Sequence, residues 1–180
     1  MKTKNTVFGF TLVELMVVVS VIGILSAIVY ANFGNARAAA RDDVRKSALK
    51  ETQLALERYK AQYGVYPAQG CGSYPIYAGR GPHPSWGCSA DQYIAGLMPD
   101  FIPDLPKDPS QEDIDGYGYL YLSTGADYKL IAHLTVESKL VQSYEDEFAR
   151  CPSSIGADPC GDSGPNPMTY AVYSPGAAGW

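Results

Sequence analysis

The stretch GFTLVELMVVVSVIGIL, residues 9–25, decides how the rest of the chain is organised. A short basic segment with Lys2 and Lys4 precedes it, and no side chain in residues 15–36 is charged. Because about 20 helical residues span the roughly 30 Å of a bilayer core, residues 15–36 are long enough to cross a membrane. The sequence therefore predicts an N-terminal transmembrane helix behind a basic leader.

Glu14 distinguishes this segment from simpler membrane signals. A secretory signal peptide would end in a small-residue cleavage site with a helix break, whereas residues 36–40 continue into a helical pattern. A plain membrane anchor gains nothing from Glu14, since a carboxylate in hydrocarbon is costly. Taken without the motif around it, Glu14 leaves three readings open: a signal peptide, a plain membrane anchor, and a segment in which the carboxylate has a special role.

Residues 9–25 and their basic leader resemble the class III signal of type IV prepilins and type II secretion pseudopilins. The shared features are a glycine, a phenylalanine directly after it, a glutamate four residues further on, and a long apolar helix. The resemblance implies that a prepilin peptidase cleaves between Gly9 and Phe10 and methylates the new amino terminus of Phe10. It also implies that Glu14 pairs with the Phe10 amine of a neighbouring subunit, which makes Phe10 and Glu14 the expected assembly residues.

The helix is expected to continue through residues 37–63, where apolar side chains recur every three or four positions. The predicted apolar stripe consists of Val44, Ala48, Thr52, Ala55, Leu56, Tyr59 and Tyr63. Glu57 and Arg58 lie off this stripe, and Gly64 predicts the end of the helix. The expected organisation is a cleaved leader (1–9), a transmembrane and filament-core helix (10–36), an amphipathic helix (37–64) and a disulfide-bonded, β-rich globular domain (65–180).

The second half of the chain predicts a small antiparallel sheet. Residues 96–109 resemble a run found in G-type major pseudopilins, with Phe101 in its aromatic position. Alternating side chains then predict strands over residues 117–122, 127–135 and 168–173, the first two joined as a hairpin, and a short helix over 136–148. The expected fold class is α+β, a pilin-like long N-terminal helix packed by its second half on the sheet.

All four cysteines follow residue 70, and no C-x-x-C pattern of a redox or structural-zinc site is present. Four cysteines allow three pairings. Pairing in sequence order, Cys71 with Cys88 and Cys151 with Cys160, closes two short loops rich in proline and glycine and is the favoured arrangement. Disulfides would place the C-terminal domain in an oxidising compartment.

The densest acidic group surrounds Gly116. Calcium binds several oxygen ligands, and some G-type pseudopilins bind calcium in their sheet loops. The candidate ligands are Asp108, Asp113, Asp115 and Asp127. A solvated acidic loop is the alternative, since the spacing does not match an EF-hand. No other cofactor is predicted.

The composition argues against nucleic-acid binding and against catalysis. The net charge is −5, which does not suit a protein that binds phosphates through bulk positive charge. His83 and His133 are isolated, and the sequence contains no nucleophile elbow, zinc-protease motif or P-loop. The chain is therefore not expected to be an enzyme.

The function predicted from these features is that of a structural subunit of a type IV pilus-like or type II secretion pseudopilus filament. The resemblance implies three partners: other copies of the chain in a helical filament, the prepilin peptidase, and an inner-membrane assembly platform with its ATPase. It implies a single-pass inner-membrane protein before assembly and a periplasmic or cell-surface filament afterwards. A minor pilin or membrane-anchored binding protein, such as a tip adhesin or a DNA-uptake receptor, is the alternative. The sequence leaves open whether the filament serves secretion, motility, adhesion or DNA uptake.

Overall fold

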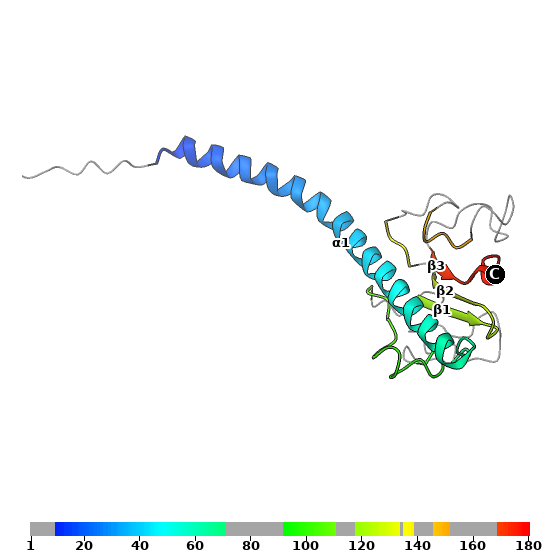
Figure 1. Ribbon diagram of the computed structural model, residues 1–180. Coiled ribbons are helices and arrows are strands. Elements are labelled where there is room, and N and C mark those ends of the chain that lie inside the picture. Colours follow the sequence, from blue (N-terminus) through cyan, green and yellow to red (C-terminus); the bar gives the residue numbers. More distant parts are fainter. Residues whose placement is uncertain (1–9, 71–91, 111–117, 134, 139–145, 152–168) are drawn as a thin grey trace, which may run out of the picture. The chain divides into compact units, whose positions relative to one another are not determined.

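The computed structural model describes residues 10–70, 92–110, 118–133, 135–138, 146–151 and 169–180, with the backbone alone at residues 28, 29, 31 and 32. Its elements are the helix α1 (Leu12–Tyr63), the strands β1 (Gly118–Ser123), β2 (Tyr128–His133) and β3 (Tyr170–Tyr173), and the 3₁₀ turn η3 (Pro175–Ala177) (Figure 1). The chain divides into two compact units, Met1–Arg37 and Ala38–Trp180, and α1 has residues in both.

The described part of the first unit is mainly the first part of α1, and the large apolar side chains described there are exposed. Phe10 is 83% exposed, and the large apolar side chains described in residues 12–33 are each at least 48% exposed. Among the described residues, no helix combines the length and apolarity that a membrane span requires. The transmembrane helix predicted over residues 15–36 is therefore not confirmed by the structure.

The second unit contains a three-stranded antiparallel sheet in the order β1-β2-β3. In its register Leu120 faces Ile131 across β1 and β2, and Leu130 faces Val172 across β2 and β3. The hairpin between β1 and β2 turns at Gly125, whose φ of +82° favours glycine. These strands confirm the three strands predicted from the sequence and the α+β fold class.

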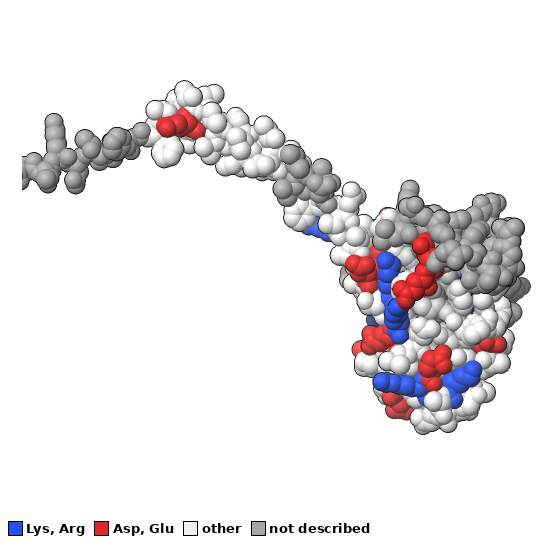
Figure 2. All heavy atoms as spheres, turned by 45° about the horizontal axis from the view of Figure 1, so that its top comes forward, with Lys and Arg blue, Asp and Glu red and all other residues white. Residues whose placement is uncertain are grey.

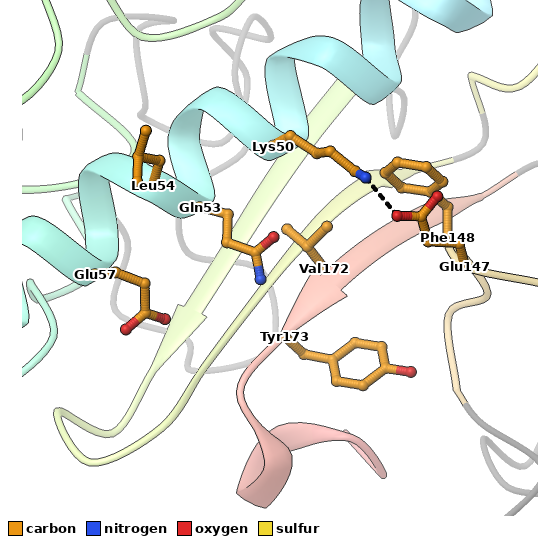
Figure 3. Close-up of a pocket in the computed structure, with 8 residues that line it drawn as sticks. All are labelled: Lys50, Gln53, Leu54, Glu57, Glu147, Phe148, Val172 and Tyr173. Atoms are coloured by element: carbon orange, nitrogen blue, oxygen red, sulfur yellow. Dashed lines mark hydrogen bonds and ion pairs between the residues drawn. The ribbon is translucent and has the colours of Figure 1, made fainter.

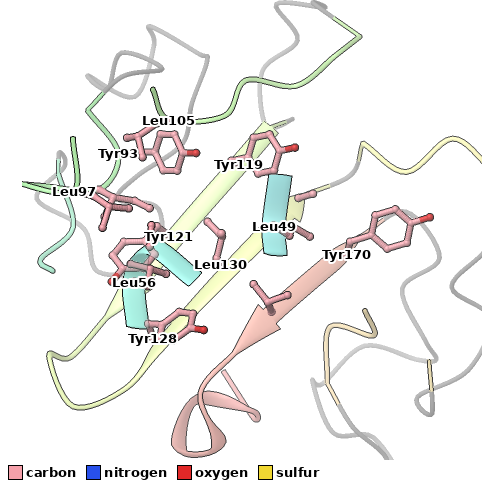
Figure 4. Close-up of a cluster of buried hydrophobic side chains, with 14 of the residues drawn as sticks. Leu49, Leu56, Tyr93, Leu97, Leu105, Tyr119, Tyr121, Tyr128, Leu130 and Tyr170 are labelled. Carbon is pink, nitrogen blue, oxygen red and sulfur yellow. The ribbon is translucent and has the colours of Figure 1, made fainter. Parts of the chain in front are cut away.

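The core of the second unit lies between α1 and one face of the sheet (Figure 4). Leu49 and Leu56 of α1 are fully buried there, and each contributes roughly 1.5–3 kcal/mol through burial of its side chain. Six of the described tyrosines also belong to this core. The buried ones are Tyr66, Tyr93, Tyr119, Tyr121, Tyr128 and Tyr170.

The buried face of α1 differs from the predicted apolar stripe. Val44 and Tyr63 are 52% and 53% exposed, whereas Asp42, Arg45 and Leu49 are fully buried. The prediction was wrong at these positions because it followed apolar residues alone, and here the buried face includes charged side chains that pair with one another. Ala55 and Leu56 of the predicted stripe are buried as expected.

The predicted end of α1 is confirmed, and the predicted helix over residues 136–148 is not. The helix ends at Tyr63, and Gly64 follows with a φ of +79° while its N–H donates to the carbonyl of Lys60. Residues 136–138 and 146–148 are not helical, and the middle of that prediction lies outside the described residues.

Candidate functional site

The start of α1 is a reciprocal hydrogen-bonded cap formed by Thr11 and Glu14. The backbone N–H and the hydroxyl of Thr11 donate to Oε2 of Glu14 at 2.8 and 2.7 Å, and the N–H of Glu14 donates to Oγ1 of Thr11 at 3.3 Å. This is the capping box expected of a threonine followed three residues later by a glutamate. In a single subunit, therefore, the carboxylate of Glu14 is bound by the subunit's own Thr11.

The apolar side chains beyond this cap form an uncharged surface on the first unit. Figure 2 shows few charged atoms on its visible face, whereas charged side chains gather over the second unit. In an isolated subunit in water, these side chains are exposed to solvent. Each Å² of exposed apolar surface is unfavourable by about 25 cal/mol. The surface is thus suited to contact lipid or other apolar helices.

A buried ionic cluster ties the second part of α1 to two loops of the second unit. Arg45 donates from Nε and Nη2 to the carboxylate of Asp108, both at 2.8 Å, and from Nη1 to Asp42 at 2.6 Å. Its Nη2 also contacts Glu137 at 3.1 Å, and Glu137 accepts two hydrogen bonds from Arg41. The side chain of Arg45 has no exposed surface, so the cluster is desolvated at its centre.

Asp42 connects the same cluster to the chain beyond β2. Its carboxylate accepts hydrogen bonds from the N–H of Glu137 at 3.2 Å and from the N–H of Ser138 at 2.7 Å. The hydroxyl of Ser138 donates to it as well. The loops around residues 108 and 137 are therefore held to one turn of α1.

The cluster also sets the acidity of its carboxyl groups. Burial alone would raise the pKa of Asp108, but hydrogen bonds from Arg45 and Ser110 outweigh it and hold that pKa below its usual value. The hydrogen bond from Arg41 lowers the pKa of Glu137 against the opposing effect of burial. Both carboxylates are thus stabilised in their charged form.

A groove of about 560 Å³ lies between α1 and β3 (Figure 3). Lys50 and Glu147 form an ion pair across one end, beside Phe148. The remaining lining residues are Gln53, Leu54, Glu57, Val172 and Tyr173. These residues leave the groove lined by both apolar and charged side chains.

The predicted cysteine and processing residues are only partly described. Cys151 is disulfide-bonded, and its partner cysteine lies outside the described residues together with the rest of the predicted cysteine set, Cys71, Cys88 and Cys160. The pairing stays a prediction. Gly9 also lies outside the described residues, and Phe10 directly precedes the Thr11 cap.

The structure does not bring the predicted calcium ligands together in the part that it describes. Asp108 binds Arg45, and Asp127 accepts hydrogen bonds from the hydroxyl of Ser174 at 2.6 Å and the N–H of Gly176 at 3.1 Å. Asp113 and Asp115 lie outside the described residues. No group of three acidic, histidine or cysteine side chains among the described residues could hold a metal ion, and calcium binding stays a prediction.

Comparison with known proteins assigns the chain to a family. The model of the prokaryotic N-terminal methylation motif matches residues 4–30. The chain is 32% identical over 126 residues to the type II secretion system core protein G of Vibrio cholerae, covering 69% of this chain and 77% of that protein. This chain belongs to the core protein G family. The core protein G of Pseudomonas aeruginosa is 33% identical over 120 residues, covering 65% of this chain and 74% of that protein.

No solved structure matches the chain significantly. Membership of the core protein G family confirms the resemblance to pseudopilins that residues 9–25 carry, and it does not favour the adhesin or DNA-uptake alternative. Within this family member, the matched methylation motif covers the Thr11–Glu14 cap and most of the exposed apolar surface.

Proposed function

We propose that this chain is the major structural subunit of a type II secretion pseudopilus. Its similarity to two core protein G chains supports this role. The observation that carries the proposal is the exposed apolar surface of the first unit, within the matched methylation motif. Such a helix is stable only in a membrane or against other copies of itself, and a filament core provides the second environment.

Processing comes first in this role. A prepilin peptidase removes residues 1–9 and methylates the amine of Phe10, as the methylation motif over residues 4–30 supports. Before assembly the subunit is anchored in the inner membrane by the apolar part of α1. An assembly platform and its ATPase then move it into a periplasmic filament, where its role is structural and not catalytic.

Glu14 sets the position of the subunit in the filament by pairing with a charge on a neighbouring copy. In the single subunit its carboxylate is held by Thr11 at the start of α1. In the filament, the methylated amine of Phe10 in a neighbouring copy supplies an opposite charge in an environment of low dielectric, where such a pair attracts strongly.

Mass spectrometry of the mature protein tests the processing on which the function depends. We expect the wild-type chain to begin at Phe10 with one added methyl group, and Gly9→Val to remain uncleaved because a branched side chain crowds the peptidase site. Gly23→Val is the matched control, since a Cβ at Gly23 meets no atom within 4 Å, and its leader should be removed. A mature wild-type chain that still carries Met1 or Lys2 would overturn the proposal.

A further inference from the structure

Most charged side chains on the part of α1 that belongs to the second unit have a partner within the chain. Those with an ion pair or a hydrogen bond are Arg41, Asp42, Asp43, Arg45, Lys46, Lys50, Glu57 and Lys60. Glu51 and Arg58 are exposed, and neither forms an ion pair or a hydrogen bond with another described residue through its side chain. They are therefore an acid and a base available to a partner molecule.

Glu51 and Arg58 lie on the same side of α1. Seven residues are about two helical turns, or roughly 10.5 Å along the helix axis, and this exceeds the three or four residues at which side chains of one helix pair. Leu54 lies between them and is 54% exposed. The exposed face of α1, as we define it, consists of Val44, Ser47, Glu51, Leu54 and Arg58. Its alternating steps of three and four residues are the spacing of a contact between parallel helices.

The charges on the exposed face of α1 fit a second copy of the same face. If two parallel copies lie side by side without a shift, Glu51 lies beside Glu51 and Arg58 beside Arg58, and these like charges repel. A shift of seven residues keeps the same side of each helix in contact and places Glu51 of one copy beside Arg58 of the other. Opposite charges placed in this way select the correct register over the unshifted one.

We propose that the exposed face of α1 contacts a second copy of this chain, parallel to it and shifted by seven residues, so that Glu51 of one copy pairs with Arg58 of the next. The inference rests on the proposed function, in which every copy enters the filament with α1 in the same direction. Each copy is displaced by about 10.5 Å from the copy before it. Because this displacement accumulates from copy to copy, the contact repeats without closing into a ring. The pair thus sets the axial spacing of the filament.

Two other arrangements of the exposed face make different predictions. An antiparallel pair centred near Leu54 also brings Glu51 beside Arg58, but it does so twice in one symmetric contact and closes as a dimer. A face that contacts only solvent leaves both charges hydrated, and their reversal then has no effect on assembly. Charge reversal separates the proposal from the second arrangement, and crosslinking separates it from the first.

The first test is the amount of full-length chain in filaments sheared from cells that also contain the secretion machinery. We expect Glu51→Arg and Arg58→Glu each to lower the filament yield at least about fivefold, because every contact then holds like charges. Both changes in one chain restore opposite charges and should recover most of the wild-type yield. Asp104→Arg makes the same change of charge at an exposed position outside α1 and should leave the yield unchanged.

Two results of this test would overturn the proposed register while leaving the proposed function intact. One is a wild-type yield from either single reversal, and the other is a double reversal that stays as low as the single ones. A wild-type chain that forms no filaments would overturn the proposed function and the register together.

The second test uses milder substitutions and locates the contact directly. Filaments of the chain with both Glu51→Cys and Arg58→Cys are treated with a short bismaleimide, which bridges neighbouring thiols. We expect a ladder of crosslinked products of many copies, since each copy is then joined to two neighbours. Lys50→Cys with Glu57→Cys has the same spacing on the side of α1 that lines the groove, and it should give no more product than the wild type.

The size of the crosslinked products decides between the arrangements. Products that stop at dimers would indicate the antiparallel pair and contradict the proposal. Crosslinking of Glu51→Cys alone to itself would indicate unshifted helices and contradict it as well. The absence of a ladder, or an equal ladder from the control pair, would show that the exposed face of α1 is not the contact.

Discussion

Arg45 shows how a single residue joins α1 to the rest of the second unit. Its guanidinium has no exposed surface and bonds to Asp42, Asp108 and Glu137. Removing one member of a buried charge cluster leaves its partners desolvated and unpaired, at a cost of about 3–5 kcal/mol. Because folded domains are stable by only about 5–15 kcal/mol, this one side chain accounts for a large share of the free energy of unfolding.

The first prediction concerns Arg45→Met, which keeps most of the side-chain volume and removes the charge. We expect the free energy of unfolding of the second unit to fall by about 3–5 kcal/mol, with a melting temperature lower by roughly 10 °C or more. Near-ultraviolet circular dichroism of the buried tyrosines measures this. Arg58→Met removes an exposed arginine from the same helix and should change stability by less than about 0.5 kcal/mol. Equal stabilities of the two variants would show that the cluster contributes nothing.

The second prediction concerns the stability of the second unit at acid pH. The pKa values of Asp108 and Glu137 are lower in the folded chain than their ordinary values of about 4, so the unfolded chain binds more protons in acid. The stability they contribute is complete above about pH 5 and is lost as the pH falls through the folded pKa values. Asp108→Asn should lower stability at neutral pH and flatten its decline below pH 5, whereas Asp104→Asn, at an exposed position, should leave the decline unchanged. Urea titrations at several pH values measure both, and an equal decline in the wild type and Asp108→Asn would contradict this origin.

At the scale of elements, two leucines within one turn of α1 differ in the exposure of their side chains. Leu56 is fully buried against the sheet, and Leu54 is 54% exposed beside the groove. We expect Leu56→Ala to destabilise the second unit by about 2–5 kcal/mol, since truncation leaves a cavity, and Leu54→Ala to cost less than about 0.5 kcal/mol. Chemical unfolding of the two variants compares them directly. A larger effect at Leu54 would mean that the helix packs on a different face.

The same helix shows what the sequence could and could not predict. Its end at Gly64 and the strands β1, β2 and β3 were predictable, because apolar periodicity and turn glycines are local signals. The Thr11–Glu14 cap was missed, although the threonine followed three residues later by a glutamate is a recognisable signal. The cluster around Arg45 left no such signal, since Asp108 and Glu137 lie 63 and 92 residues away in the chain.

At the scale of the whole molecule, the chain divides into two units with different requirements. The second unit has its own core and is stable through the packing of α1, the sheet and the Arg45 cluster. The first unit has exposed apolar side chains and one acidic residue, Glu14. A substitution at Glu14 should therefore affect assembly without affecting the folding of the second unit.

The most direct test is the amount of mature chain in filaments sheared from cells that express it with its secretion machinery. We expect the wild-type chain to be the main protein of these filaments. Glu14→Ala should be cleaved and folded but scarce in them, because the Phe10 amine of a neighbour loses its partner, and coexpressed wild type should partly restore its incorporation. A wild-type chain absent from the filaments, or Glu14→Ala present at the wild-type level when expressed alone, would contradict the account.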